Sequence, residues 1–238
     1  MISRYGGGER GARSAARARS VLVVVDAFRA STTISLLVSR GARVVPVASI
    51  SEAAAARADL RIGERGSAKV AGFDFGNSPV EVSEARVPAG TTAVMSTTNG
   101  TRVVEAGLGA AAIYTGAFVN AGRLAGRLHG RFPDAEVVVV GCGWEGRRAS
   151  EDEAAAGAIL SRLERLGSEL DPRARLVAER YERRPAAALR TNSAARRLLR
   201  LGHEEDIEFC LREDAVPCAP RLLGGAFTEE PEPLPQSE

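Results

Sequence analysis

The chain has 238 residues, of which 45% are hydrophobic, so it can bury a sizeable core as one domain or as two closely packed subdomains. Its 32 basic and 30 acidic residues leave a net charge of only +2, which gives no indication of a nucleic-acid-binding protein. Three cysteines without C-x-x-C spacing argue against a disulfide framework, and no apolar run reaches the ~20 residues of a membrane span, so we expect a soluble, cytoplasmic protein.

The two ends of the chain are predicted to be tails. Residues 1–19 are rich in Arg, Gly and Ala and lack the apolar segment of a secretory signal, which predicts a flexible tail, with a mitochondrial transit peptide as the alternative. Residues 227–238 are rich in Pro and Glu and are predicted to be disordered. The folded part is therefore predicted to be residues 20–226.

Apolar, β-branched runs of strand length alternate with segments of helical periodicity. The predicted strands are 21–25, 43–48, 92–96, 111–115 and 136–140, and the predicted helices are 31–40, 51–62, 101–108, 118–131 and 150–166. The run VLVVV is apolar at every position, which is typical of a strand buried on both faces. The alternation predicts an α/β fold with a mixed or largely parallel sheet covered by helices.

The pattern is weaker after residue 168. It predicts a strand at 175–179, an Arg-rich amphipathic helix at 186–201 and a short acidic helix at 204–212. No linker-like stretch separates this region from the preceding one.

Five short polar segments, most of them rich in Gly, follow or interrupt the apolar runs. They are residues 25–33, 63–65, 72–79, 96–102 and 141–153. Ligands of α/β sheets gather at the carboxyl ends of strands, where helix N-termini also present free N–H groups to anions, and four of the five segments are predicted to lie there. Their carboxylates suit a hard cation and their arginines suit phosphate or carboxylate.

The first segment places Asp26 directly after VLVVV and before Arg29, Ser31 and Thr32. A carboxylate beside a helix N-terminus and a guanidinium can hold Mg²⁺ against a bound phosphate, or can itself attack phosphorus. Phe28 stands where the aspartyl-phosphate signature has a second Asp, so nucleophilic attack by Asp26 stays an alternative. In the simplest alternative, Asp26 only caps the helix and Arg29 lies in solvent.

The second and third segments contain charged residues between glycines, a composition that predicts loops rather than regular structure. Glu64 and Arg65 are candidate catalytic residues, Asp74 is a candidate metal ligand, and Asn77 and Ser78 are candidate donors to phosphate oxygens. Ordinary turns are the alternative, because such residues are common in loops.

The fourth segment, STTNGTR, follows an apolar run and opens a predicted helix. Thr98, Asn99 and the N–H of Gly100 would face the edge of the sheet, and Arg102 would add a positive charge, so the segment predicts a phosphate cradle. A β-turn without a ligand is the alternative.

The fifth segment allows two incompatible interpretations. Cys142 and Arg148 fit the C-x5-R spacing of cysteine-dependent phosphatases, but Glu145 would repel phosphate within that loop. In the interpretation that we favour, Cys142 is a small buried residue, and Glu151 and Asp152 lie in the first turn of a helix. These two carboxylates are then either metal ligands or complements to the helix dipole.

The five segments, in this order, resemble the 2-phosphosulfolactate phosphatase family, a family of Mg²⁺-dependent enzymes first associated with coenzyme M biosynthesis. The shared motifs are Asp-x-x-Arg-Ala-Ser-Thr-Thr at 26–33, Gly-Glu-Arg at 63–65, Asp-x-Gly-Asn-Ser-Pro at 74–79, Thr-Thr-Asn-Gly-Thr at 97–101 and Glu-Asp-x-x-Ala-Ala-Gly at 151–157. The resemblance covers roughly residues 20–218. It implies the α/β fold of that family, a catalytic domain over residues 20–226, and hydrolysis of (R)-2-phospho-3-sulfolactate to 3-sulfolactate and phosphate.

These observations combine into one hypothesis. Mg²⁺ is held by Asp26 with one or more of Glu64, Asp74, Glu151 and Asp152, while Arg29, Arg65 and Arg102 neutralise charge on the phosphate. The expected partner is a small phosphorylated metabolite that is also sulfonated or carboxylated, and a homo-oligomer is the default expectation for such an enzyme. A cysteine-dependent phosphatase and a non-catalytic phosphometabolite-binding protein remain as alternatives.

Overall fold

The computed structural model describes residues 1–183 and 186–230. Its strands are β1 (Ile2–Gly7), β2 (Val21–Val25), β3 (Arg43–Pro46), β4 (Leu60–Arg65), β5 (Ala68–Lys69), β6 (Thr92–Ser96), β7 (Ala112–Thr115), β8 (Glu136–Gly141), β9 (Glu169–Leu170), β10 (Pro220–Leu223) and β11 (Ala226–Glu229). Its α-helices are α1 (Gly8–Ala18), α2 (Ala30–Ser39), α3 (Ile50–Ala55), α4 (Pro79–Glu84), α5 (Gly100–Ala106), α6 (Ala121–Arg131), α7 (Ser150–Arg165), α8 (Pro172–Arg183), α9 (Ser193–Arg200) and α10 (Glu204–Cys210). Two 3₁₀ helices, η1 (Phe118–Asn120) and η2 (Ala186–Thr191), complete it.

The strands form one mixed sheet with the order β5-β4-β6-β3-β11-β10-β7-β2-β8-β1-β9. Two blocks of parallel strands, β4-β6-β3 and β7-β2-β8-β1-β9, are joined in the middle by the antiparallel hairpin β10–β11. In its strand pairing, the hairpin is joined to each block at one pair of residues, Arg221 with Tyr114 and Phe227 with Val44. The predicted α/β fold with a mixed, helix-covered sheet is confirmed.

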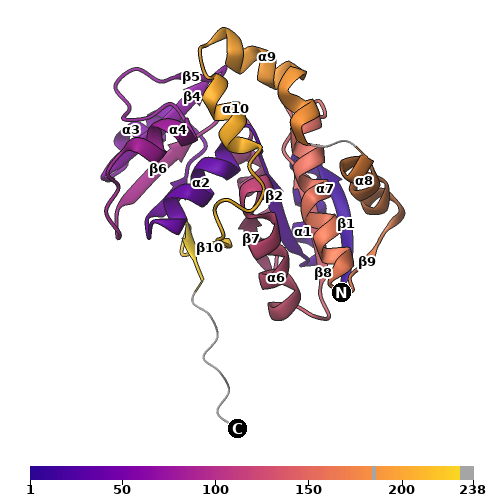
Figure 1. The fold of residues 1–238 in the computed structure, drawn as a ribbon. Helices are drawn as coiled ribbons and strands as arrows, with labels where there is room; N and C mark the ends of the chain where they lie inside the picture. Colours follow the sequence, from indigo (N-terminus) through magenta and orange to yellow (C-terminus); the bar gives the residue numbers. More distant parts are fainter. Residues whose placement is uncertain (184–185, 231–238) are drawn as a thin grey trace.

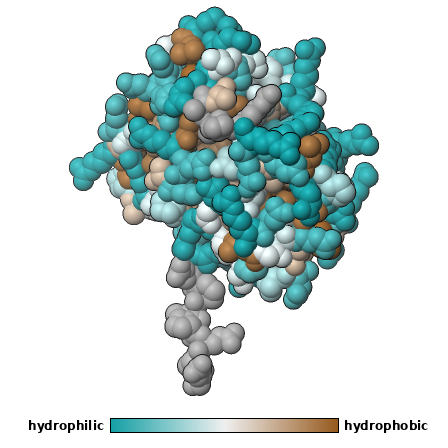
Figure 2. All heavy atoms as spheres, turned by 45° about the vertical axis from the view of Figure 1, so that its right-hand side comes forward, coloured by the Kyte–Doolittle hydropathy of each residue, from teal (hydrophilic) through white to brown (hydrophobic). Residues whose placement is uncertain are grey.

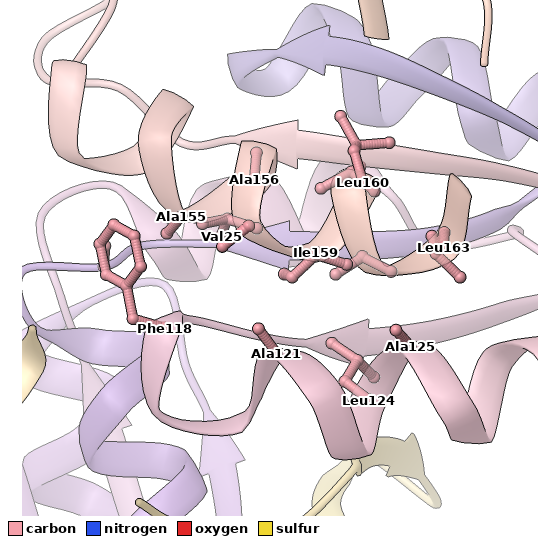
Figure 3. Packing of buried hydrophobic residues seen from close by; sticks show 14 of the residues in the cluster. Val25, Phe118, Ala121, Leu124, Ala125, Ala155, Ala156, Ile159, Leu160 and Leu163 are labelled. Atoms are coloured by element: carbon pink, nitrogen blue, oxygen red, sulfur yellow. The ribbon is translucent and has the colours of Figure 1, made fainter. Parts of the chain in front are cut away.

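The central strand β2 is buried on both faces, as its uninterrupted apolar sequence predicts. Val21, Val23 and Val25 pack into a core cluster with α6, α7 and α8, whereas Leu22 and Val24 point to the opposite face, toward α1, α2 and α5. Figure 3 shows the first of these clusters, where side chains of α6 and α7 meet Val25. This two-sided packing fixes the end of β2, from which Asp26 follows.

The predicted N-terminal tail is wrong, because residues 2–18 form β1 and α1. Strand β1 pairs with β8 along its whole length, and α1 buries Ala12 and Ala15 against the sheet. Gly6 and Gly11 allow this close approach, since a Cβ on Gly6 would lie 3.2 Å from the Cα of Gly11. The amino-acid composition led to a wrong prediction here, because a helix face made of alanines can be buried without the large apolar residues that usually indicate a core.

Three other predicted elements differ from the structure. The predicted strand at 175–179 is part of α8, whose buried Ala174, Val177 and Ala178 follow helical spacing. The predicted helix at 51–62 ends at Ala55, and the Gly-Glu-Arg segment then lies on β4 rather than in a loop. The predicted helix at 186–201 is divided by Asn192, which caps α9.

The remaining C-terminal predictions have mixed outcomes. The acidic helix predicted at 204–212 is confirmed as α10. The first three residues of the predicted tail, 227–229, belong to β11, and residues 231–238 lie outside the described residues.

The surface in Figure 2 is mainly hydrophilic, with apolar residues scattered rather than gathered into one patch. Single exposed apolar side chains such as Leu108 are normal on a folded protein. Among the helices of the described residues, none combines the length and hydropathy needed to cross a bilayer.

Candidate active site

A small cavity of about 20 Å³ lies where the carboxyl ends of β2, β4, β6 and β8 meet. It is lined by Asp26, Phe28, Arg29, Glu64, Ser67, Asn77, Asn99, Gly143, Trp144, Glu151, Asp152 and Arg197. A cavity of this size has room for one water-sized group. Both blocks of the sheet contribute to it, and α9 lies across it, at the top of the molecule in Figure 1.

Four carboxylates converge on this cavity. Asp26 comes from the end of β2, Glu64 from β4, and Glu151 and Asp152 from the first turn of α7. Glu64, Glu151 and Asp152 expose only 6, 6 and 4% of their surface. Buried acidic residues are rare unless they are paired or bind a cation, so this cluster marks a functional site.

Two of these carboxylates are fixed by hydrogen bonds from the main chain. The Asp152 carboxylate accepts hydrogen bonds from the N–H of Ala27 and of Gly143, each at 2.8 Å, and so joins the loops after β2 and β8. Glu64 accepts hydrogen bonds from the N–H and the hydroxyl of Thr98, at 2.7 and 2.8 Å, and from the N–H of Ser67 at 2.7 Å. The geometry of the site is therefore set before any ligand binds.

The cluster raises the pKa values of its own members. Burial, followed by the charge of Glu64, raises the pKa of Asp26 to about 7. Burial also raises the pKa of Glu151, and burial together with Asp26 raises the pKa of Asp152 well above its usual range. These shifts reflect burial first and repulsion between the carboxylates second, and a divalent cation would favour the ionised forms.

Arg29 is buried and held by a partner that the sequence does not reveal. Its Nη1 lies 2.5 Å from the Oδ2 of Asp206, and its Nη2 donates to the carbonyl oxygen of Ser67 at 2.8 Å. The other Asp206 oxygen accepts a hydrogen bond from the hydroxyl of Ser78 at 2.5 Å. No sequence signal separates Asp206 from Glu204 and Glu205 in the same helical turn.

The sequence analysis also missed Arg197 and Trp144. The Arg197 guanidinium lies over the Trp144 ring, 3.7 Å from its centroid, and its Nε donates to the hydroxyl of Ser67 at 3.0 Å. Helical phase offers a signal for Arg197, because Ala194 and Leu198 mark the buried face of α9 and Arg197 borders it.

Asn77 is the clearest sign of a missing partner in the site. It is 3% exposed and lines the cavity, and within the described residues its Oδ1 has no hydrogen-bond partner. Its φ of 91° is in the left-handed region, which Asn tolerates better than most residues. A buried acceptor without a donor is costly and commonly marks the position of an ion, water or ligand.

The hydroxyl groups expected to bind phosphate are largely engaged within the protein. Ser31 accepts a hydrogen bond from the N–H of Asp26 at 2.8 Å, and Thr32 donates to the carbonyl oxygen of Ala27 at 3.1 Å. Ser78 caps α4 and binds Asp206. These side chains shape the loop around Asp26 rather than line the cavity.

Of the predicted phosphate cradle, only Asn99 lines the cavity, although the neighbouring Gly100 lies close to Asp26. A Cβ on Gly100 would stand 3.0 Å from the Asp26 Oδ2, so a larger residue here would push this carboxylate aside. Thr98 contributes through Glu64.

Three predicted site residues lie outside the cavity lining. Asp74 is exposed, and its Oδ2 accepts a hydrogen bond from the N–H of Arg61 at 2.7 Å. Arg65 is exposed on β4, where its Nη2 donates to the hydroxyl of Ser96 at 3.1 Å. Arg102 is exposed on α5. Of the three arginines of the predicted clamp, only Arg29 lines the cavity, and Arg197 lines it as well.

The Cys142 geometry does not fit a thiolate nucleophile. Burial raises the pKa of the Cys142 thiol well above its ordinary value, whereas a nucleophilic cysteine needs a lowered pKa. Arg148, the would-be phosphate ligand, is exposed and pairs with Glu153. The interpretation of Cys142 as a small buried residue is the one that the structure supports.

Replacing Cys142 with Ala is therefore expected to leave phosphatase activity within a few-fold of the wild type. The thiol has no nucleophilic role in this arrangement, and its side chain is small. Phosphate release before and after iodoacetamide treatment checks this. Loss of activity in both the variant and the alkylated wild type would instead return Cys142 to the reaction.

Two larger cavities are also present. One of about 690 Å³ is lined by Gly6–Gly8 and several arginines and shares Gly143 and Asp152 with the candidate site, and one of about 710 Å³ lies beside α8. Neither is lined by Asp26, Glu64 or Glu151, so neither combines the four carboxylates described above.

Known proteins are similar in sequence to this chain over most of its length. The profile of one family, 2-phosphosulpholactate phosphatase, matches residues 10–225. A probable 2-phosphosulfolactate phosphatase of Thermotoga petrophila is 38% identical over 212 residues, covering 86% of this chain and 90% of the relative. Proteins with the same description in Parasynechococcus marenigrum and Gloeobacter violaceus are each 38% identical, covering 83 and 84% of this chain and 87 and 86% of the relative. The chain, with its carboxylate cluster at the strand ends, thus belongs to the 2-phosphosulpholactate phosphatase family of phosphoric monoester hydrolases.

Proposed function

We propose that this chain hydrolyses 2-phospho-3-sulfolactate to 3-sulfolactate and phosphate in a reaction that depends on Mg²⁺. The observation that carries the proposal is the convergence of Asp26, Glu64, Glu151 and Asp152 on one small, buried cavity. The substrate is the one named for the relatives described above. The reaction class follows from the family to which the chain belongs.

The donor set fits Mg²⁺, which prefers oxygen ligands and is usually bound by one or two carboxylates together with substrate phosphate and water. Asp26 and Glu151 are the best-placed carboxylates, because each keeps an oxygen without a hydrogen bond among the described contacts. The unpartnered Oδ1 of Asn77 is a third oxygen in the same cavity. Within residues 1–183 and 186–230, no three His, Cys, Asp or Glu side chains already stand close enough to enclose a metal ion.

The bound cation would supply charge neutralisation at the phosphate and polarisation of its oxygens. The protein side chains have separate tasks. Arg29, held by Asp206, presents positive charge at the start of α2. Asp152 and Glu64 fix the loops on either side of the cavity through main-chain hydrogen bonds.

Phosphate release from 2-phosphosulfolactate is expected with Mg²⁺ and is expected to be lost in EDTA. The reason is that the uncompensated carboxylates would repel the phosphate dianion without the cation. The measurement compares the same protein with Mg²⁺, with EDTA, and with Mg²⁺ restored after EDTA. An aryl phosphate serves as the comparison substrate.

Each outcome of this test has a distinct meaning. Restored activity that prefers the sulfolactate ester would support the proposal. Equal activity in EDTA would remove the cation from the reaction. Saturable binding of the ester without phosphate release under any divalent metal would favour a phosphometabolite-binding protein.

A further inference from the structure

Arg197 differs from the other arginines of its helix in where its side chain lies. Arg196 and Arg200 on α9 are exposed, whereas Arg197 is half-buried and lines the cavity. It is also one of only two arginines among the lining residues. Helix α9 thus places one guanidinium, that of Arg197, beside the carboxylate cluster.

The two cavity arginines are held in different ways. Arg29 is locked in a buried ion pair with Asp206, and its terminal nitrogens both have partners. Arg197, in the part of the chain that the structure describes, forms no ion pair, and its one hydrogen bond uses Nε. Its guanidinium otherwise rests on the Trp144 ring. The planar fork of Arg197 therefore remains available to an incoming anion.

The contacts that hold Arg197 are easily exchanged. A cation–π contact at a partly exposed site is weak, while a carboxylate or sulfonate can bind a guanidinium through two charge-assisted hydrogen bonds. Trp144 lies in a tight turn in which Gly143 and Gly146 have φ values of 74° and 77°, and it is itself half-buried. An anion in the cavity can therefore draw Arg197 away from this ring without breaking an ion pair.

A sulfolactate ester needs such a residue. Besides its phosphate it carries a carboxylate and a sulfonate, and each of these would be repelled by Asp26, Glu64 and Glu151 unless a cation met it. The cavity as it stands holds only a water-sized group, so a substrate must displace part of the wall. Asp26, Glu64 and Asp152 have main-chain partners. Arg197 is held by one side-chain hydrogen bond to Ser67, by the Trp144 ring and by attraction to the charge of Glu151.

We propose that Arg197 is the receptor for the second acid group of the substrate, a carboxylate or sulfonate on its carbon chain, and that it leaves the Trp144 ring to bind it. The inference rests on the proposed function and names the residue that gives that function its substrate class. Arg197 is a specificity residue in this scheme and does not act on the phosphate ester bond. The planar guanidinium can bind either a carboxylate or a sulfonate through two hydrogen bonds. The experiment must therefore distinguish these two groups.

The test uses Trp144 as a reporter, because it is the only tryptophan of the chain. Loss of the stacked guanidinium is expected to change its fluorescence. Titration of the wild type with 3-sulfolactate, isethionate or lactate is expected to give a saturable change, which Arg197→Gln should abolish. Isethionate carries only the sulfonate and lactate only the carboxylate, so the ligand that reproduces the signal identifies the group bound. Because this readout does not require turnover, it tests Arg197 even if the substrate assignment fails.

Kinetics supply the second readout. Arg197→Gln is expected to lower kcat/KM about 10- to 100-fold for 2-phosphosulfolactate, mainly through KM, and to lower it much less for ethyl phosphate, which lacks the second acid group. Arg197→Lys should recover part of the loss, since it keeps the charge but not the fork. Arg196→Gln, one residue away and exposed, is the matched control and should behave as the wild type.

Two results would overturn the inference. One is an equal loss of activity toward ethyl phosphate and 2-phosphosulfolactate in Arg197→Gln, which would mean a structural role. The other is a wild-type Trp144 signal that none of the three acids changes. Failure of the proposed function looks different, because the wild type itself would then release no phosphate from any ester.

Discussion

Replacing Asp26 with Asn is expected to reduce phosphate release on the order of a thousandfold while making the Mg²⁺-free protein more stable at pH 8. Asn keeps the size of the side chain but removes one of the converging negative charges. The loss of activity follows from the central position of Asp26 among Glu64, Glu151 and Asp152. The gain in stability follows from relief of the repulsion that raises the pKa of Asp26.

The sign of the pH dependence can be derived from that pKa. The pKa of Asp26 rises from 3.8 in the unfolded chain to about 7 in the fold, so between these values the folded protein holds a proton that the unfolded chain has released. The contribution of Asp26 to the free energy of unfolding is therefore fully present only below the unfolded pKa. This contribution is lost as the pH rises through the folded pKa. Within that window one pH unit corresponds to about 1.4 kcal/mol for a single group.

The measurement is the thermal midpoint in EDTA at pH 4.5 and pH 8. The wild type is expected to lose stability across this range, and Asp26→Asn is expected to lose less. Asp74→Asn is the matched control, because Asp74 is exposed and lies outside the cavity lining, and its activity should stay close to that of the wild type. Near-normal turnover by Asp26→Asn would remove Asp26 from the mechanism.

Replacing Asp206 with Asn is expected to destabilise the protein by about 3–5 kcal/mol. Asp206 is 1% exposed, and its carboxylate is the ion-pair partner of the buried Arg29 guanidinium. Removing its charge leaves Arg29 buried without a counter-ion, which costs far more than losing an exposed pair. The thermal midpoint should fall on the order of 10 °C, given about 2–4 °C per kcal/mol for a chain of this size.

Activity should fall with stability in this variant, because Arg29 would no longer be held at the start of α2. Glu208→Gln is the control on the same helix, since Glu208 pairs with Arg190 at the exposed surface and its loss should barely change the midpoint. An unchanged thermal midpoint in Asp206→Asn would mean that the Arg29 guanidinium has another counter-ion or becomes hydrated.

Site residues that directly follow a strand could be predicted from the sequence. VLVVV is a strand because every position is buried, and the residue after it must then lie at the edge of the sheet, which places Asp26. Glu151 and Asp152 were predicted by a different argument, as residues of the first turn of a helix, and α7 confirms that position. Strand order could not be predicted, because the hairpin β10–β11 pairs with strands far from it along the chain.

The contribution of the C-terminal helices could not be predicted for a physical reason. Asp206 and Arg197 reach the site through the tertiary path of α9 and α10 over the strand ends, and no local pattern encodes that path. Asp74 shows a different limit. In this structure its carboxylate accepts a hydrogen bond from the N–H of Arg61, a role that residue type and spacing do not distinguish from metal binding, so its part in a metal site stays a prediction.

The central hairpin has a consequence for the order in which the protein can fold during synthesis. Every other strand of the described sheet is made before β10 and β11, yet these two join its halves. We expect β3 and β7 to lack these pairing partners until the last strands have been synthesised. The nascent chain is therefore expected to be most prone to edge-to-edge aggregation just before β10 and β11 emerge, and the strand pairing that joins the two blocks of the sheet can be completed only then.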